Sequence, residues 1–186
     1  MPRSPASASS RLLAAVAAAD TALLQAAARL RRADVDRAVA AFSRAGNYGV
    51  GWVALGAAVS VARRDPRPLL ATAITVWGTL AVNYGVKQMV RRERPDLAEA
   101  PRAIEAPSSS SFPSSHAAMS AAGALALGVA VPKARRPLQV VALLMTYSRV
   151  HLAVHHPSDV VAGYALGAIT SRAADVLVPA RRRRGR

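Results

Sequence analysis

Long apolar segments separated by short basic loops fill residues 45–178. Each segment is close to the ~20 residues that a helix needs to cross the hydrocarbon core of a bilayer. Prolines stand near the starts of three of them, where a helix tolerates a missing N–H. The pattern predicts an all-α membrane bundle with about five transmembrane helices, at roughly 45–62, 68–86, 115–131, 137–154 and 158–178.

The first 44 residues have a different pattern. Apolar positions recur there at helical spacing, but Asp20, Gln25 and Arg29 interrupt the Ala-rich run. Helices with one apolar and one polar face lie on membrane surfaces, so we expect two N-terminal interfacial amphipathic helices. A sixth span over 12–30 is the main alternative. A cleaved signal peptide is another, and the early Asp20 counts against it.

Composition agrees with a membrane protein. The chain is 52% apolar but has only two Phe and two Trp, and Ala supplies much of the apolar fraction. Small side chains allow helices to approach closely in a bilayer. The chain has no cysteine, which excludes disulfides and thiolate chemistry. We expect three parts: N-terminal helices (1–44), a membrane bundle (45–178) and a basic tail (179–186).

The formal net charge of +15 is concentrated in short clusters between the apolar segments and in the tail. Such charge suits an anionic membrane surface or an anionic substrate. Aromatic side chains interleaved with basic ones, which single-strand binders use, are missing. We therefore expect the bilayer and a lipid as partners and no nucleic acid. The sequence does not indicate an oligomeric state.

The loops also bear on orientation. With five spans, the loops 63–67 and 132–136 and the tail share one face, which carries eleven Lys and Arg. The positive-inside rule favours this face for the cytoplasm. The N-terminal region, with seven Arg, then lies on the opposite face, so the signal is mixed. That opposite face also holds the polar, Pro- and Ser-rich connection 96–114, which is either a plain linker or a lid over a site.

The opposite face collects most of the side chains capable of chemistry. They come from three distant parts of the sequence, which the five-span topology brings to one membrane edge. All four histidines of the chain lie in the last two of these parts. The candidates are Lys87 and Arg94, then Ser114, Ser115 and His116, then Arg149, His155 and Asp159.

This set of side chains is suited to phosphoryl transfer. Three fixed cations match a tetrahedral oxyanion such as phosphate, and a helix start after Ser114 would offer free N–H groups to the same anion. A cationic cage stabilises the charge on the equatorial oxygens. His155, followed four residues later by Asp159, resembles a nucleophile oriented by a carboxylate. His116 can protonate the leaving group and then activate water.

Three motifs carry a family resemblance: K-x6-RP at 87–95, PSSH at 113–116 and SR-x5-H-x3-D at 148–159. In order and spacing they resemble the signatures of the type 2 phosphatidic acid phosphatase superfamily. The resemblance implies a small membrane helical bundle that dephosphorylates lipid phosphates without a metal or other cofactor. Ser115 stands where the family usually has Gly, and a side chain there bears on how closely the backbone approaches phosphate.

The resemblance also implies the roles of the site residues and the class of substrate. Lys87, Arg94 and Arg149 would bind the phosphoryl group together with Ser114 and the Ser115 amide; His155 would be the nucleophile, Asp159 its partner and His116 the acid. The chain looks similar to bacterial polyprenyl-pyrophosphate and decaprenyl-phosphoryl-phosphoribose phosphatases. We therefore expect a bacterial plasma-membrane enzyme of cell-envelope biosynthesis whose site faces outward. Phosphatidic acid and phosphatidylglycerophosphate are alternative substrates.

Plainer interpretations apply to the other polar side chains. We expect His151 and His156 to be structural. A metal site at His151 and His155 is disfavoured, because no Cys or nearby Glu joins them. Arg91 and Arg92 are expected to contact headgroups or solvent, and Arg172 to snorkel or to pair with Asp175.

Three functions of other classes remain as alternatives: an inactive lipid-binding protein, a nucleic-acid binder and a vanadate-dependent haloperoxidase. The complete set of catalytic residue types counts against the first. The second would rest on the tail and the charge alone, and the apolar spans count against the third, which is a larger soluble protein.

Overall fold

The computed structural model describes residues 7–98 and 100–177, and the side chains of 174–177 are not described. The described residues form helices and connecting loops, with short 3-10 turns at Asn47–Gly49 and Pro132–Ala134. The helices are α1 (Ala8–Arg29), α2 (Ala33–Ala45), α3 (Val50–Arg63), α4 (Arg67–Val90), α5 (Ser115–Ala130), α6 (Arg135–His151) and α7 (Pro157–Leu177). The all-helical prediction is confirmed, and α3 to α7 match the five predicted apolar segments to within a few residues at most ends.

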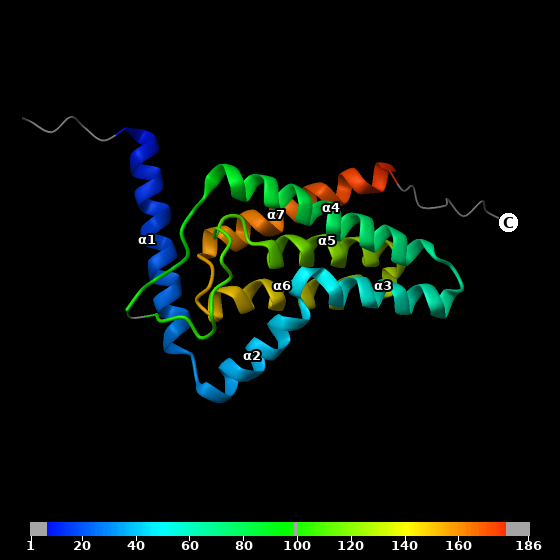
Figure 1. Cartoon of the computed structure of the whole chain (residues 1–186), viewed down its shortest axis with the longest axis horizontal. Coiled ribbons are helices and arrows are strands. Elements are labelled where there is room, and N and C mark those ends of the chain that lie inside the picture. The colour runs from blue at the N-terminus through cyan, green and yellow to red at the C-terminus, as the bar shows by residue number, and fades with distance from the viewer. Residues whose placement is uncertain (1–6, 99, 178–186) are drawn as a thin grey trace, which may run out of the picture.

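Helix α5 lies at the centre of the bundle and packs against α4, α6 and α7 (Figure 1). Most of its residues are small and fully buried, including Ala117, Ala118 and Ala121. The crossing with α7 is close, because a Cβ added at Gly167 would meet the backbone of Ala118. Small residues at this contact give the close approach that membrane helices use in place of a hydrophobic driving force.

The helices differ in their capacity to cross a bilayer. Among the described residues, α1 and α4 are long and apolar enough to do so by length and composition, and α5 is apolar but shorter. The number of spans therefore stays a prediction.

Helices α1 and α2 form a V at one end of the bundle, and α1 runs across the direction of the bundle helices (Figure 1). Both were expected as helices. Most of α1 is exposed, with Leu13 and Leu23 facing outward, whereas Asp20 and Leu24 are buried. Helix α1 contacts α6 and α7. The buried face of α1 that packs on the bundle is therefore narrow, and it includes the charged Asp20.

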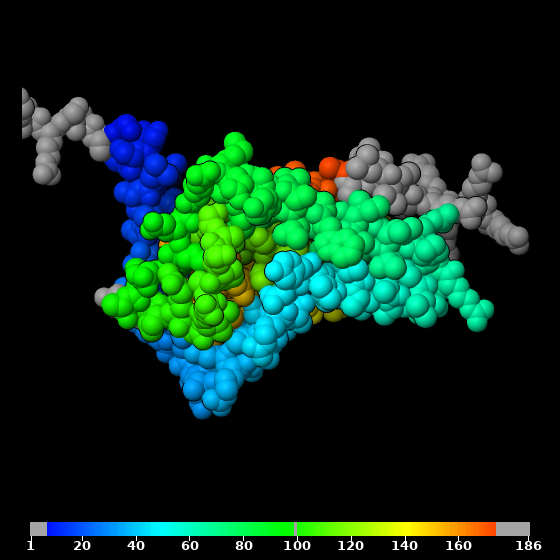
Figure 2. All heavy atoms as spheres, viewed as in Figure 1, coloured from blue at the N-terminus to red at the C-terminus, as the bar shows by residue number. Residues whose placement is uncertain are grey.

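The connection from α4 to α5 packs over the same end of the bundle. Its backbone is tied to its neighbours, because Ser111 N–H donates to Arg92 O at 2.7 Å and Ala103 N–H donates to Leu152 O at 3.1 Å. Figure 2 shows this segment in green on the surface between α1 and α4. An ordered cover agrees with the lid interpretation rather than with that of a plain linker.

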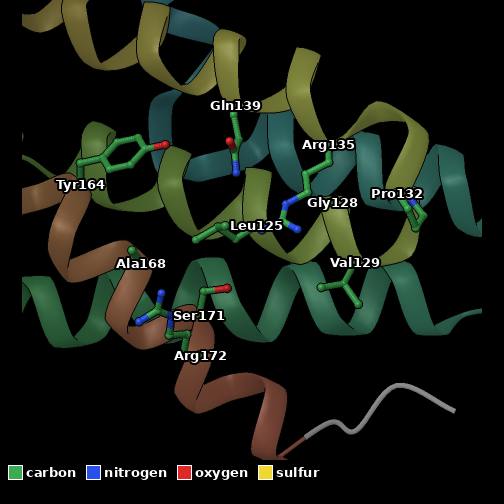
Figure 3. Close-up of a pocket in the computed structure, with 10 residues that line it drawn as sticks. All are labelled: Leu125, Gly128, Val129, Pro132, Arg135, Gln139, Tyr164, Ala168, Ser171 and Arg172. Atoms are coloured by element: carbon green, nitrogen blue, oxygen red, sulfur yellow. The ribbon is translucent and has the colours of Figure 1, made fainter. Parts of the chain in front are cut away.

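A cavity of about 630 Å³ lies at the opposite end of the bundle, between α5, α6 and α7 (Figure 3). Its polar lining comes from Arg135, Gln139, Tyr164, Ser171 and Arg172. It shares no residue with the predicted site. The Arg172 side chain is exposed at this cavity, and the side chain of its expected partner, Asp175, lies outside the described residues.

Candidate active site

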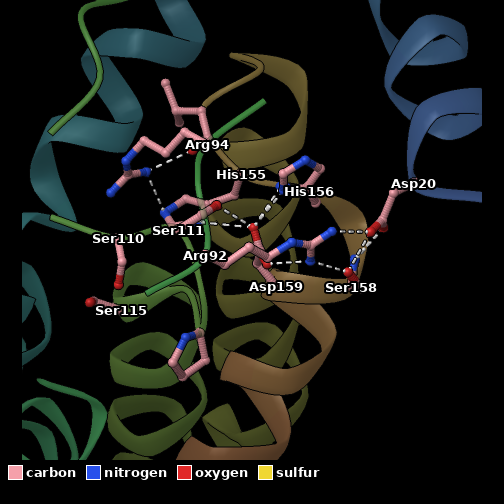
Figure 4. Close-up of polar contacts among 12 residues, drawn as sticks. Asp20, Arg92, Arg94, Ser110, Ser111, Ser115, His155, His156, Ser158 and Asp159 are labelled. Atoms are coloured by element: carbon pink, nitrogen blue, oxygen red, sulfur yellow. Dashed lines mark hydrogen bonds and ion pairs between the residues drawn. The ribbon is translucent and has the colours of Figure 1, made fainter. Parts of the chain in front are cut away.

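The three motifs meet at the end of the bundle that α1 and α2 border (Figure 4). His155 lies in the short segment between α6 and α7, and Asp159 lies in the first turn of α7. Both are almost completely buried, at 2% and 0% exposure. Burial of a carboxylate and an imidazole in one cluster demands that each polar atom finds a partner.

Local backbone contacts place these two side chains. Helix α7 begins at Pro157, and the Asp159 carboxylate accepts the His156 N–H at 2.8 Å, which caps the helix start. The N–H of Ser114, at the start of α5, donates to the Asp159 carbonyl at 3.0 Å. The second and third motifs are thereby joined directly.

The nucleophile candidate has a defined tautomer. His155 Nε2 lies 3.1 Å from Arg94 Nη1. Because a guanidinium can only donate, Nε2 accepts and Nδ1 carries the ring proton. Burial, with smaller effects from Arg94 and Arg149, lowers the pKa of His155 to about 3, although the Asp159 carboxylate opposes this shift. The ring is therefore neutral at neutral pH, with a lone pair on Nε2.

The link from His155 to Asp159 passes through a serine. His155 Nδ1 is 3.7 Å from Asp159 Oδ2, too far for a hydrogen bond. It lies 3.4 Å from Ser111 Oγ, and that hydroxyl donates to Asp159 Oδ2. Ser111 is fully buried. Ser111 thus links the imidazole to the carboxylate by hydrogen bonds. In activated nucleophiles a carboxylate orients the histidine in a similar way.

The three predicted cations lie at this end of the bundle, and Arg94 contacts the histidine directly. Arg94 also donates to the Val154 carbonyl at 2.7 Å, and Lys87 donates to the Ser110 carbonyl. Arg149, 3% exposed, donates from Nη1 to Ser43 Oγ at 2.6 Å. These contacts fix the charges with neutral acceptors, so the positive charge of all three cations is retained.

Two buried donors at the site have no protein partner among the described residues: Ser114 Oγ and Arg149 Nε. Both belong to the predicted phosphate ligands. A buried unsatisfied polar atom costs about 1–3 kcal/mol, so its persistence needs a reason. Donors from a hydroxyl and a guanidinium match an oxyanion.

The acid candidate is held from the other side. His116, in the first turn of α5, has Nε2 3.1 Å from Asn47 Oδ1. The Ser115 hydroxyl donates to Asn83 Oδ1 on α4 at 2.7 Å. The side chain that replaces the family glycine is therefore turned toward α4.

The expectation for Arg92 is wrong. Its side chain does not lie free at the surface: Nη1 donates to Asp159 Oδ1 at 2.7 Å and Nη2 to Asp20 Oδ2 at 2.8 Å. The connection after α4 folds back on itself, as the hydrogen bond from Ser111 N–H to Arg92 O shows. This fold brings the Arg92 side chain to the start of α7. Arg91 is exposed, and its side chain bonds only the nearby Gln88 carbonyl in the described part of the chain.

The two remaining histidines differ. His151 is structural as expected, with Nε2 2.8 Å from Asp36 Oδ1. His156 is also satisfied, but by the Asp159 carboxylate itself, at 3.2 Å from Nδ1. Across residues 7–98 and 100–173, whose side chains the structure describes, no three His, Asp or Glu side chains gather in a metal-binding arrangement.

Sequence reasoning did not assign a site role to Asp20, Arg92 or Ser111. Asp20 carried a signal, because a charge within an apolar helix needs a partner. Ser111 carried none, since it is one of four consecutive serines.

Comparisons with known proteins identify relatives of the chain. Residues 67–183 match the PAP2 superfamily. Over 144 residues the chain is 35% identical to decaprenylphosphoryl-5-phosphoribose phosphatase of Mycobacterium tuberculosis, a match that covers 76% of this chain and 79% of that protein.

Two solved structures have the same fold. A transmembrane PAP2-type phosphatidylglycerolphosphate phosphatase from Bacillus subtilis gives a TM-score of 0.76 at 25% identity, covering 92% of this chain and 90% of that one. LpxE from Aquifex aeolicus gives a TM-score of 0.72 at 21% identity, covering 83% of this chain and 93% of that one. The family match over more than half of the chain, together with the mycobacterial relative, shows that the chain belongs to the PAP2 superfamily of membrane lipid phosphatases.

Proposed function

We propose that this membrane phosphatase hydrolyses a polyprenyl phosphate ester or pyrophosphate through a phosphohistidine on His155. One observation carries the proposal: the charge balance of the site. Four cations, Lys87, Arg92, Arg94 and Arg149, face two carboxylates, Asp20 and Asp159, which leaves an excess of two positive charges in a largely buried cluster. A phosphate dianion neutralises that excess, and Ser114 Oγ and Arg149 Nε supply donors for its oxygens.

The chemistry has two steps. In the first, the Nε2 lone pair of His155 attacks phosphorus, the bond to the leaving oxygen breaks, and His116 donates a proton to that oxygen. In the second, His116 takes a proton from water, the water oxygen attacks phosphorus, and the P–N bond breaks. His155 regains its lone pair and inorganic phosphate leaves. Lys87, Arg94 and Arg149 stabilise the equatorial oxygens in both steps.

The leading substrates are decaprenyl-phosphoryl-phosphoribose and undecaprenyl pyrophosphate, which would place the enzyme in cell-envelope biosynthesis of a bacterium. The named activity of the mycobacterial relative supports the first. Phosphatidylglycerophosphate or phosphatidic acid is the second candidate class, supported by the B. subtilis neighbour. An inactive lipid-binding role would not need a neutral His155 beside unsatisfied phosphate donors.

For the membrane, we propose that α3 to α7 cross the plasma membrane and that α1 and α2 lie at its outer surface. The crosswise direction of α1 supports this arrangement, because a helix perpendicular to spanning helices lies in the membrane plane (Figure 1). The site end then faces outward, and the loop 132–136 at the far end of α5 faces the cytoplasm.

A substrate panel tests the activity. The purified full-length protein should release phosphate from decaprenyl-phosphoryl-phosphoribose or undecaprenyl pyrophosphate faster than from phosphatidic acid or phosphatidylglycerophosphate. Release should persist in EDTA, because fixed cations already neutralise the phosphoryl oxygens, and should fall with orthovanadate. Faster release from the glycerolipids would favour the second candidate class. A strict requirement for Mg²⁺ would contradict the proposed mechanism.

Cysteine labelling tests the orientation. The chain has no native cysteine, and Ser108 and Lys133 are exposed at opposite ends of the bundle. In intact cells, a membrane-impermeant maleimide should label Ser108→Cys and should label Lys133→Cys only after the cells are opened. The reverse pattern would place the site in the cytoplasm.

The two catalytic histidines should separate by leaving group. His155→Ala should abolish turnover of any substrate, because no covalent intermediate forms. His116→Ala should slow phosphoenzyme formation by about 10²–10⁴-fold with dodecyl phosphate and much less with p-nitrophenyl phosphate, whose leaving group needs no proton. Single-turnover trapping measures this step alone. Equal losses on both substrates would show that His116 is not the acid.

Ser111 should act as the link between His155 and Asp159. Ser111→Ala removes the hydroxyl that orients Nδ1–H, and we expect kcat to fall about tenfold with little change in KM, in line with the loss of one or two hydrogen bonds. Ser108→Ala, an exposed serine of the same run, is the matched control and should match wild type. Wild-type kcat in Ser111→Ala would mean that Asp159 orients His155 directly.

A further inference from the structure

Asp20 is a charged side chain buried on a mostly exposed helix. It is 3% exposed, and α1 carries it into the bundle at the start of α7. A buried carboxylate without partners is strongly unfavourable. Asp20 also lies outside the segment that matches the PAP2 superfamily, which begins at residue 67. The hydrogen bonds that Asp20 makes hold α1 against the start of α7.

Asp20 forms a closed ring of hydrogen bonds with its two partners, Arg92 and Ser158 (Figure 4). Asp20 Oδ1 accepts the Ser158 N–H at 2.8 Å, and Oδ2 accepts the Ser158 hydroxyl at 2.6 Å and Arg92 Nη2 at 2.8 Å. Arg92 Nη1 donates to Ser158 Oγ at 2.7 Å. The carboxylate thus sits at the N-terminal end of α7, where a negative charge is favoured.

Arg92 connects this ring to the site. Its Nη1 also donates to Asp159 Oδ1 at 2.7 Å, so one guanidinium bridges two carboxylates. Oδ1 of Asp159 is thereby held by Arg92, and Oδ2 is left for Ser111 and His156. The rotation of the Asp159 carboxylate follows from the position of Arg92, which Asp20 fixes.

The charges of the ring have a second effect. Without Asp20, the charge of Arg92 would offset that of Asp159. Asp159 would then attract less strongly the positively charged imidazole that forms when His155 is phosphorylated. Asp20 offsets the Arg92 charge, and Asp159 keeps its negative potential toward His155. The geometry points to Asp20 as a positioning residue that acts through Arg92 on the Asp159–His155 pair. This inference rests on the proposed role of His155.

Asp20→Asn tests the inference, with Asp36→Asn as the matched control. Asp36 also pairs with one arginine, Arg31 at 3.1 Å, and with one residue of the third motif, His151, but no contact joins it to Asp159 in the described residues. With p-nitrophenyl phosphate, Asp20→Asn should lower kcat about tenfold, the scale of a coupled pair. KM should stay within about twofold, because the phosphate ligands are unchanged. Asp36→Asn should keep the wild-type kcat.

A double-mutant cycle separates action through Arg92 from a general structural role. In the Arg92→Gln background, the further change Asp20→Asn should alter kcat by less than about twofold, because the bridge is already lost. A tenfold further loss would overturn the inference. This comparison also carries the test where Asp20→Asn alone does not fold, since Asp20 and Arg92 lose their charges together and Asp159 keeps its donors from Ser111 and His156.

Two further outcomes keep the inference apart from the proposed function. If His155→Ala is inactive and Asp20→Asn has wild-type kcat with an intact fold, the inference alone is wrong. If His155→Ala retains turnover, the proposed function itself fails. If Asp20→Asn and Asp36→Asn change KM and thermal stability equally and both keep the wild-type kcat, Asp20 contributes to stability only.

Discussion

The buried carboxylate of Asp159 is the group on which the site end of the protein depends. Such a carboxylate is stable only when donors saturate its oxygens. Ser111 and the His156 N–H donate to Oδ2, and Arg92 donates to Oδ1. These donors come from the loop after α4 and from the start of α7. The contacts that fold this end of the bundle are therefore the contacts that orient His155.

The N-terminal helices complete the site, although they precede the segment that matches the family. Asp20 of α1 fixes Arg92, Ser43 of α2 accepts from Arg149, and Asn47 after α2 holds His116. These contacts satisfy one buried side chain, Arg149, and two partly exposed ones, Arg92 and His116. The helices at the end of the bundle thus supply neutral or compensating partners, and they leave the excess positive charge that the proposed function assigns to a phosphate.

The sequence predicted the helices, and it predicted that the motif residues meet at one end of the bundle, for a physical reason. Apolar runs of spanning length and prolines at helix starts are local features, so α3 to α7 follow from them. The motif residues lie on these helices or within a few residues of their ends, so their spacing in the sequence places them. Arg92 and Ser111 could not be assigned, because their roles depend on how the loop after α4 folds back over the bundle. A basic cluster and a run of serines permit many such paths, and only the packed loop selects one residue from each.

In the proposed function the polar site binds a phosphoryl group, and no polar side chain described in it is placed to distinguish one lipid tail from another. That discrimination falls to apolar surface beside the site. Leu13 and Leu23 on α1 are more than half exposed, on the same helix that buries Asp20 among Arg92 and Ser158. In the proposed interfacial placement of α1, these leucines meet lipid while Asp20 holds the Asp159 carboxylate through Arg92. A tail that displaces α1 would then change the orientation of Asp159 as well as the fit of the lipid. Under this proposal, substrate choice and the geometry of the nucleophile would be coupled through α1.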